Sequence, residues 1–215
     1  MKQIDKIKTL RFEFSTSLLN DKHLSSSPLK LFEQWMDHAL RKKVSEPNAM
    51  TLATSMKSGM VDARIVLLRD FTSKGFTFFS NYNSIKGQEI RQNKNVCLNF
   101  FWSEIHRQVR IRGTVVKLSS QISDAYFAKR PRESQLAAWA SQQSEKLSGR
   151  NELMNRYEFY AEKFLGEKVP RPNHWGGYLV KPTYFEFWQG QTNRLHDRIA
   201  YVKKKNGWQR FRINP

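Results

Sequence analysis

Short strand-like segments separated by tight turns place the strongest constraint on the fold of this chain. Residues 49–56 and 63–69 are rich in aliphatic and β-branched side chains, and Lys57-Ser58-Gly59 between them predicts a turn. Similar patterns predict strands over residues 76–80, 96–102, 108–117, 177–180, 184–188, 199–202 and 208–213. Because short strands joined by tight turns pair antiparallel, the sequence predicts a small antiparallel β-barrel.

Helical signals stand before and between these segments. Ser27-Pro28 predicts a helix start, since Ser is a good N-cap and Pro is favoured at the first helical position. Apolar residues recur at helical spacing from Phe32 to Leu40, and Glu46-Pro47-Asn48 is expected to end that helix. Further helices are predicted over residues 84–92, 119–129, 133–141 and 151–164. The fold class is therefore α+β, with residues 21–215 as a single domain and residues 1–20 as a mobile arm.

Composition excludes several classes of protein. Aromatic residues make up 13% of the chain, which argues against disorder. The single cysteine, Cys97, leaves no internal disulfide and no cysteine metal cluster, so no metal site is expected. No stretch approaches the ~20 apolar residues of a membrane helix, and the first residues lack the apolar core of a signal peptide. A cytoplasmic protein without a membrane partner is expected.

The net charge is unusual for an ordinary globular chain. Lys and Arg number 37 against 19 Asp and Glu, which gives a formal charge of +18. Such an excess predicts attraction to polyanions: nucleic acid, a membrane surface or phosphorylated small molecules. The basic residues are spread along the chain, so most are expected to form a solvated surface without a specific role.

Two segments near predicted strand ends carry residues suited to anions. Arg64 and Arg69 bracket an apolar run and, being five apart, point to opposite faces of a regular strand. They are either the charged ends of a core strand or a phosphate clamp, because guanidinium matches phosphate oxygens. Residues 79–86 bring Ser80 and Lys86 to a strand end and a helix start. That arrangement predicts an anion site equally as well as ordinary helix capping.

A third segment places three further polar groups close together in the sequence. Tyr126 and Arg130 are four apart and are expected to share a helix face, while Pro131 ends that helix. Ser134 falls near the start of the next helix. The three side chains either converge on one phosphate or form a solvated corner.

The most informative segment is the alternation of Arg194, His196 and Arg198. If extended, these three side chains lie on one face of the chain. Two cations beside an imidazole cost stability by repulsion and lower the pKa of the histidine. Since structure alone has little use for that arrangement, it predicts a bound anion or an electron-rich cofactor.

These four segments, in this order, resemble the pyridoxine/pyridoxamine 5′-phosphate oxidase family. The stretch from Trp188 to Arg198 resembles the signature of that family, and the resemblance extends from about Arg11 to Pro215. It implies a split β-barrel homodimer with one FMN in each of two clefts between the subunits. The implied reaction oxidises pyridoxine or pyridoxamine 5′-phosphate to pyridoxal 5′-phosphate and reduces O2 to hydrogen peroxide.

The resemblance also implies a role for individual residues. Those implied to bind FMN are Arg64, Ile65, Val66, Leu67, Arg69, Phe79, Ser80, Lys86, Gln108, Gln143, Ser144, Trp188 and Arg198. Those implied to bind the phosphorylated pyridine substrate are Arg11, Phe14, Arg69, Tyr126, Arg130, Ser134, Arg194 and His196. Arg194 and His196 form the implied catalytic pair. Four of the FMN-binding residues are expected to come from the partner subunit: Gln143, Ser144, Trp188 and Arg198.

Three positions depart from the usual family pattern. Arg69 stands in place of a Lys, Ile85 in place of an Arg, and Phe14 in place of a Tyr. We expect these changes to weaken binding without removing the chemistry.

Three alternatives remain beside the family resemblance. Another split-barrel flavoprotein would not need the phosphate-directed residues Arg69, Tyr126, Arg130 and Ser134. A nucleic-acid-binding module is suggested by the charge, but it does not account for the dense Trp188–Arg198 loop, and no specific nucleic-acid partner is expected. A purely structural role leaves that loop unexplained.

Overall fold

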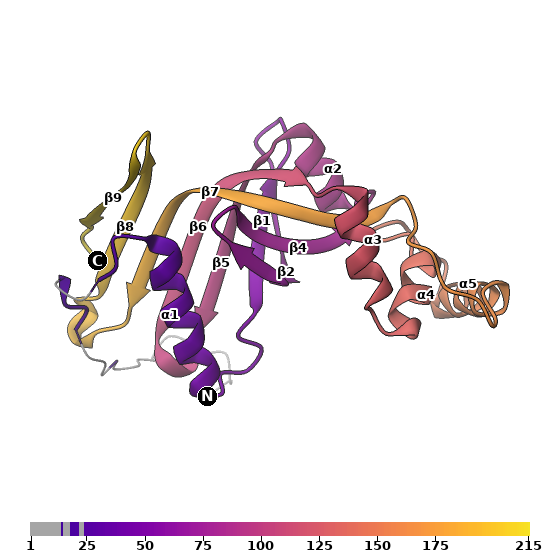
Figure 1. Ribbon diagram of the computed structural model, residues 1–215, viewed down its shortest axis with the longest axis horizontal. Helices are drawn as coiled ribbons and strands as arrows, with labels where there is room; N and C mark the ends of the chain where they lie inside the picture. Colours follow the sequence, from indigo (N-terminus) through magenta and orange to yellow (C-terminus); the bar gives the residue numbers. More distant parts are fainter. Residues whose placement is uncertain (1–13, 15–17, 22–23) are drawn as a thin grey trace, which may run out of the picture. The chain divides into compact units, whose positions relative to one another are not determined.

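The computed structural model describes residues 14, 18–21 and 24–215 (Figure 1). Most of the predicted arm, residues 1–20, therefore lies outside the described residues. The elements run α1 (Pro28–Arg41), β1 (Ala49–Ser55), β2 (Val61–Leu67), β3 (Asp70–Thr72), β4 (Gly75–Asn81), α2 (Ile85–Gln92), β5 (Asn95–Trp102), η3 (Ser103–Ile105), β6 (Arg107–Lys117), α3 (Ser120–Ala128), α4 (Arg132–Ala140), α5 (Arg150–Lys163), β7 (Trp175–Gln189), η4 (Thr192–Arg194), β8 (Asp197–Lys204) and β9 (Gly207–Arg212).

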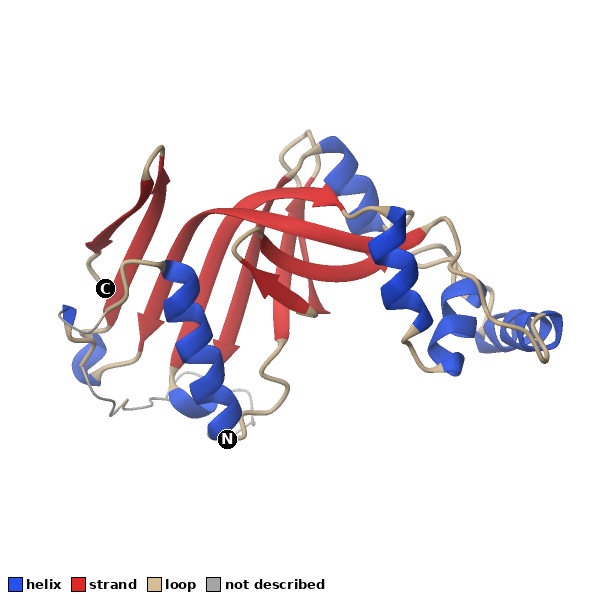
Figure 2. Cartoon of the chain, in the orientation of Figure 1, coloured by secondary structure: helices blue, strands red, loops and turns tan. Residues whose placement is uncertain are grey.

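The described strands are hydrogen-bonded in the order β2-β1-β5-β6-β7-β4-β3, with β8 paired to β7 and β9 paired to β8. Five of these pairings are antiparallel: β1–β2, β3–β4, β4–β7, β7–β8 and β8–β9. Figure 2 shows the mixture of antiparallel strands and helices that the sequence predicts. The predicted α+β fold is confirmed.

The chain divides into two compact units. Unit 1 comprises Met1–Pro47, Asn99–Ile111 and Tyr184–Pro215, and unit 2 comprises Asn48–Leu98 and Arg112–Thr183. The strands β5, β6 and β7 contribute residues to both units. The predicted phosphate-directed residues from Arg64 to Ser144 belong to unit 2, whereas the Trp188–Arg198 loop belongs to unit 1.

Helix α1 supplies the apolar face of unit 1. Ser27 caps it by accepting a hydrogen bond from the Lys30 N–H, as the sequence predicts. The ring of Phe32 lies 5.1 Å from that of Phe100, and Trp35 lies 5.2 Å from Phe187. The helix ends at Arg41, before the predicted Glu46-Pro47-Asn48 stop, and Lys43 adopts a left-handed backbone with φ of 53°.

One buried cluster of unit 2 lies where its last helices meet β7. Five buried side chains form this cluster: Phe127, Leu136, Phe164, Val169 and Trp175. They come from α3, α4, the segment after α5 and the start of β7, and α3, α4 and α5 lie together in Figure 2. The packing of these helices fixes the positions of Tyr126 and Arg130, which bear on function.

Strand β7 differs from the sequence-based prediction. It is one strand of 15 residues, whereas the apolar pattern predicts two strands interrupted at Lys181-Pro182-Thr183. Residues up to Val180 pair with β4, and pairing with β8 begins at Tyr184. Pro182 therefore falls between these two ladders, where its missing N–H removes no hydrogen bond from either.

The end of β2 also differs. The strand stops at Leu67, so the expectation that Arg64 and Arg69 sit on opposite faces of one regular strand is wrong. The Arg69 N–H instead donates to the Thr77 carbonyl, and the short strand β3, which the sequence did not predict, follows at Asp70.

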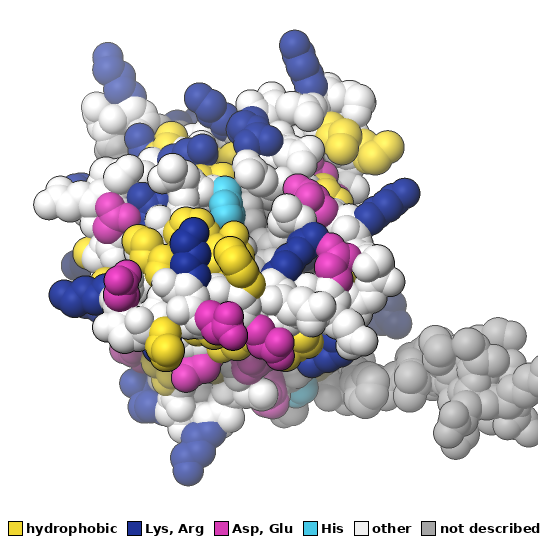
Figure 3. All heavy atoms as spheres, turned by 90° about the vertical axis from the view of Figure 1, so that its right-hand side faces the viewer, with side chains coloured by type: hydrophobic (Ala, Val, Ile, Leu, Met, Phe, Trp, Pro, Cys, Tyr) yellow, Lys and Arg dark blue, Asp and Glu magenta, His cyan; other side chains and the backbone are white. Residues whose placement is uncertain are grey.

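The charged surface agrees with the reading of a dispersed basic excess. On the face shown in Figure 3, Lys and Arg side chains are scattered among acidic and apolar ones. Within the described part of the chain, no helix is long and apolar enough to cross a membrane.

Candidate active site

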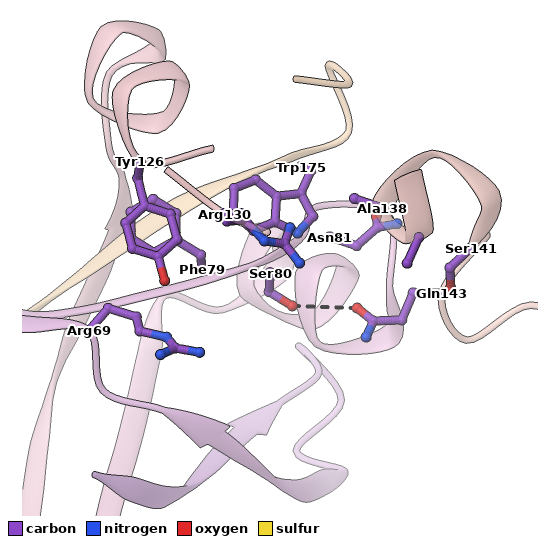
Figure 4. A pocket seen from close by; sticks show the side chains of 11 residues that line it. Arg69, Phe79, Ser80, Asn81, Tyr126, Arg130, Ala138, Ser141, Gln143 and Trp175 are labelled. Atoms are coloured by element: carbon purple, nitrogen blue, oxygen red, sulfur yellow. Dashed lines mark hydrogen bonds between the residues drawn. The ribbon is translucent and has the colours of Figure 1, made fainter. Parts of the chain in front are cut away.

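A cavity of about 270 Å³ in unit 2 brings together predicted substrate-binding residues (Figure 4). We call it the Arg130 cavity. It is lined by Arg69, Phe79, Ser80, Asn81, Tyr126, Arg130, Ala137, Ala138, Ser141, Gln143 and Trp175. Figure 4 shows the guanidinium groups of Arg69 and Arg130 directed into the same space.

Aromatic stacking holds the wall of this cavity. Tyr126, in the last turn of α3, stacks on Phe79 of β4 with ring centroids 3.7 Å apart and an interplanar angle of 9°. Phe79 in turn stacks on Trp175 at 5.5 Å. Arg130 follows the end of α3, and its Cζ lies 4.5 Å above the Trp175 ring. Tyr126 and Arg130 therefore line one cavity, although Arg130 lies beyond the helix on which the two were expected to share a face and Ser134 does not line the cavity with them.

The Arg130 side chain is half-buried. Its Nη1 is buried and has no hydrogen-bond partner among the described residues, and burial lowers the pKa of Arg130. The ion pairs among the described residues include neither Arg69 nor Arg130. Since a buried donor without an acceptor is costly, this geometry suits a bound anion.

A second cavity, of about 520 Å³, adjoins the first. We call it the Lys86 cavity. It is lined by Asp62, Arg64, Ile65, Val66, Leu67, Arg69, Phe79, Ser80, Ile85, Lys86, Gln143 and Ser144. Four of these residues also line the Arg130 cavity: Arg69, Phe79, Ser80 and Gln143. The two cavities are therefore contiguous, and together they hold most of the predicted residues of unit 2.

Lys86 is the buried cation of the second cavity. It lies in the first turn of α2, where the Ser84 hydroxyl caps the helix. Its Nζ lies 3.2 Å from Ser84 Oγ and 3.1 Å from Gln143 Oε1, and burial, with the nearby Arg64 charge, lowers its pKa to about 8. Gln143 Oε1 is also 3.4 Å from Ser80 Oγ. Gln143 makes these contacts with Lys86 and Ser80 of its own chain, whereas the resemblance implies that Gln143 reaches the FMN site of the partner subunit.

Arg64 is already paired with acidic groups. Its Nη2 lies 2.5 Å from Asp62 Oδ2 and 3.1 Å from Glu89 Oε2, and its Nη1 donates to the Thr54 hydroxyl. The Glu89 side chain is almost fully buried. The positive charge of Arg64 is thus largely compensated, whereas Lys86 and Arg69, which also line this cavity, form no ion pair among the described residues. The sequence carries no signal for this pairing, because Glu89 lies on another element.

The Trp188–Arg198 loop of unit 1 holds the imidazole of His196 by a hydrogen bond from the loop backbone. The Gln191 N–H donates to His196 Nδ1 at 3.1 Å, so in the neutral ring Nε2 carries the proton. Burial, followed by the charges of Arg194 and Arg198, lowers the pKa of His196. The predicted direction of that shift is confirmed. His196 therefore presents an N–H donor at neutral pH.

The Arg198 guanidinium is held by hydrogen bonds to Glu186 and to the Asn214 carbonyl. Its Nε and Nη2 donate to Glu186 Oε1 at 3.0 and 2.7 Å, and its Nη1 donates to the Asn214 carbonyl at 2.8 Å. Glu186 is 3% exposed and also accepts from Arg110. Burial opposes ionisation of this carboxyl, but the hydrogen bonds from Arg198 and Arg110 outweigh it and lower the pKa of Glu186.

The loop itself is not extended, so the predicted alternation on one face is wrong. Thr192–Arg194 form a single 3-10 turn, and β8 begins only at Asp197. Asn193 and Arg194 have φ values of 54° and 60°, in the left-handed region that residues other than glycine adopt uncommonly. Arg194 is exposed and His196 half-buried.

Phe14 packs against this loop. Its ring lies 4.8 Å from His106, 5.7 Å from His196 and 5.8 Å from Trp188. A Cβ on Gly190 would lie 2.8 Å from Phe14 Cγ, so only glycine leaves room for the ring. Sequence analysis assigned no role to His106 or Gly190.

The remaining predicted residues fall in different places. Gln108 is half-buried on β6 in unit 1. Ser134 lies in the first turn of α4 and does not line either cavity. Arg11 lies outside the described residues. Conversely, Asn81, Ser141 and Trp175 line the Arg130 cavity without having been predicted.

The donors present in unit 2 suit phosphate and an aromatic ring rather than a metal ion. Guanidinium, ammonium and hydroxyl groups are the partners of phosphate oxygens, and the aliphatic wall of Ile65, Val66 and Leu67 suits a flat ring. No cluster of three or more potential metal ligands occurs among the residues the structure describes.

Comparison with known proteins places this geometry in a family. Residues 36–158 match the family described as pyridoxamine 5′-phosphate oxidase, and residues 175–215 match the pyridoxine 5′-phosphate oxidase C-terminal dimerisation region. The second match indicates that the chain forms a homodimer.

Individual relatives agree along the whole chain. A pyridoxine/pyridoxamine 5′-phosphate oxidase of Microcystis aeruginosa is 48% identical, covering 97% of this chain and 98% of the relative. One of Leptospira interrogans is 46% identical, covering 98% and 99%.

Solved structures show the same fold. PhzG from Burkholderia lata, in complex with tetrahydrophenazine-1-carboxylic acid, has a TM-score of 0.88 at 28% identity, covering 94% of this chain and 100% of that one. A pyridoxamine 5′-phosphate oxidase-related, FMN-binding protein from Nostoc punctiforme has a TM-score of 0.71 at 16% identity, covering 89% and 100%. On the two family matches and the full-length identity, the chain belongs to the pyridoxamine 5′-phosphate oxidase family.

Proposed function

We propose that this protein oxidises pyridoxine 5′-phosphate and pyridoxamine 5′-phosphate to pyridoxal 5′-phosphate, using FMN as cofactor and O2 as oxidant. The observation that carries the proposal is the buried Nη1 of Arg130, which has no partner among the described residues, in a cavity contiguous with the Lys86 cavity. Two adjoining anion sites suit one phosphorylated cofactor and one phosphorylated substrate. Family membership supports FMN and the pyridine substrate as that pair.

The Lys86 cavity fits FMN. Lys86 and the Ser80 hydroxyl would bind its phosphate, and the exposed Ile65 side chain with Val66 and Leu67 would line its ring. Arg64 would join the phosphate site at the cost of its ion pairs with Asp62 and Glu89. When bound, FMN supplies the two-electron acceptor that the oxidation needs and returns the electrons to O2.

The Arg130 cavity fits the substrate phosphate. Arg69 and Arg130 offer two guanidinium groups that have no carboxylate partner among the described residues, and the Tyr126 hydroxyl lies on the same wall. Binding would give the Arg130 Nη1 an acceptor. Ser134 stays a prediction from the resemblance, since it does not line this cavity.

The residues of unit 1 would act on the substrate ring and the flavin. We assign Arg194 and His196 to the ring, with His196 Nε2–H as a hydrogen-bond donor, because Nδ1 already accepts from the backbone. Arg198, held by Glu186, would place its positive charge beside the reduced cofactor. In the homodimer, Trp188 and Arg198 of the partner subunit would complete the site together with Gln108, whereas Gln143 and Ser144 would belong to the same chain as Lys86.

The remaining assignments follow the same proposal. Phe14 and Arg11 would close over the substrate as part of an arm spanning residues 1–20, with residues 21–215 acting as one FMN-binding domain. The protein would work in the cytoplasm, without a nucleic-acid or membrane partner.

A product assay tests the proposed function. Purified protein, supplied with FMN and pyridoxine 5′-phosphate in air, should form pyridoxal 5′-phosphate and hydrogen peroxide in equal amounts. Dephosphorylated pyridoxine should react far more slowly, because it leaves the Arg130 cavity empty. Equal rates with the two alcohols would contradict the assignment of that cavity.

A further inference from the structure

Lys86 is set apart from the other lysines by its surroundings. It is 7% exposed, and it lines a cavity of about 520 Å³. Its hydrogen-bond partners are two neutral oxygens, Ser84 Oγ and Gln143 Oε1. The ion pairs among the described residues do not include it. A buried ammonium without a carboxylate partner has a strong tendency to lose its proton.

The charged groups near Lys86 come from β2, from α2 and from the segment after β2. Arg64 and Asp62 lie on β2, Glu89 lies on α2 itself, and Arg69, which lines the same cavity, follows the end of β2. Burial lowers the pKa of Lys86 most, the Arg64 charge lowers it further, and the two carboxylates oppose this, so the result is about 8. At pH 8 roughly half of this amine is neutral, on the order of 100-fold more than for an ordinary lysine of pKa about 10.4.

A neutral lysine amine is the nucleophile that aldehydes require. Lys86 also lies beside an anion site, because Gln143 Oε1 joins its Nζ to Ser80 at the border of the Arg130 cavity. An aldehyde that carries a phosphate on the neighbouring ring substituent can therefore be anchored and attacked in one place. The product of the proposed reaction is an aldehyde of this kind.

We propose that Lys86 of the flavin-free protein is a covalent capture site for phosphorylated aldehydes, pyridoxal 5′-phosphate above all. The Lys86 nitrogen attacks the aldehyde carbon, and the resulting carbinolamine loses one water molecule to give an imine, with no change in oxidation state. Because FMN would occupy the same cavity, capture and cofactor loading exclude each other. The product thereby delays the maturation of newly made protein. This inference rests on the proposed function, which places FMN at Lys86 and makes the aldehyde the product.

The test uses full-length protein from which FMN has been removed. It is incubated with pyridoxal 5′-phosphate at pH 8, treated with borohydride to reduce any imine to a stable amine, digested and analysed by mass spectrometry. We expect one equivalent of label on Lys86, with at least tenfold less on exposed lysines such as Lys74. Lys86→Arg should remove the label, whereas the matched control Lys74→Arg should leave it unchanged.

Two competition arms identify the site. Prior addition of FMN, or of inorganic phosphate at high concentration, should reduce Lys86 labelling at least tenfold. Pyridoxal without its phosphate should label Lys86 at least tenfold more slowly. Labelling spread over exposed lysines with Lys86 unmodified, or labelling of Lys86 that FMN does not affect, would overturn the inference. If FMN binds and the enzyme turns over while Lys86 stays unlabelled, only this inference fails, and failure of FMN to bind refutes the proposed function instead.

Discussion

Arg130→Met should have opposite effects on substrate use and on folding stability. The guanidinium has a buried Nη1 without a partner, and the proposed function gives it the substrate phosphate as acceptor. A hydrogen bond between charged groups contributes ~1.5–3 kcal/mol, so its loss should lower kcat/KM for pyridoxine 5′-phosphate about 10- to 150-fold. Dephosphorylated pyridoxine should be affected little, because it makes no such contact.

The same substitution should not destabilise the ligand-free protein. An unsatisfied buried donor costs ~1–3 kcal/mol, and removing the guanidinium recovers that cost. Against this, the contact of Arg130 with the Trp175 ring at 4.5 Å contributes ~0.5–1 kcal/mol, which is lost. The free energy of unfolding should therefore rise by about 0–2.5 kcal/mol in the absence of phosphate.

Arg132→Met is the matched control, two residues along the chain. Both terminal nitrogens of Arg132 donate to carbonyls, those of Glu167 and Phe164, so its removal should lower the free energy of unfolding by ~1–3 kcal/mol. Arg132 lines neither cavity, and kcat/KM should stay near that of the wild type. Urea unfolding and steady-state kinetics measure both quantities. The reasoning is refuted if Arg130→Met destabilises the protein as Arg132→Met does and leaves kcat/KM unchanged.

Three further predictions concern other parts of the proposed site. Because its pKa is lowered, the ionised Glu186 carboxylate stabilises the fold above pH ~4.3, and this stabilisation is lost as the pH falls through the folded-state pKa. Glu186→Gln should therefore lower the free energy of unfolding at pH 7, and progressively less below pH 4. Plots of the urea midpoint against pH that run parallel for the two proteins would contradict this. Gly190→Ala should push Phe14 away from the loop and change the tryptophan fluorescence spectrum. Gly149→Ala is the control and should leave the spectrum unchanged, because an added Cβ there meets nothing within 4 Å. Identical spectra for Gly190→Ala and the wild type would argue against the packing of Phe14. Ile85→Arg adds a cation to the Lys86 cavity and should strengthen FMN binding by ~1 kcal/mol. In a fluorescence titration the Kd should fall about fivefold. An unchanged Kd would show that this position does not reach the phosphate.

Local sequence patterns predicted what depends on local structure. The Ser27-Pro28 helix start, most strands and the convergence of Tyr126 with Arg130 follow from residues that lie close together in the chain. The cap needs only its own first turn, so it depends little on the rest of the fold. The spacing of Tyr126 and Arg130 keeps them close together in the chain, while their contacts with Phe79 and Trp175 complete the cavity wall.

The features that the sequence could not predict depend on which elements meet. Arg64 is neutralised by Glu89 of α2, and Arg198 is held by Glu186 from the neighbouring strand β7. Neither pairing follows from spacing, because strand register and helix placement are tertiary properties. The extended reading of Arg194 failed for a different reason, since the left-handed Asn193 and Arg194 turn the chain just before β8.

The central claim is that this chain carries a flavin that a phosphorylated pyridine alcohol reduces. It is tested most directly by the absorption spectrum of the FMN-loaded protein, recorded without oxygen before and after addition of pyridoxine 5′-phosphate. The account predicts that the yellow flavin band bleaches and then returns in air, with one pyridoxal 5′-phosphate formed per flavin reduced. A bound flavin that stays oxidised in the presence of excess substrate would contradict the proposed function.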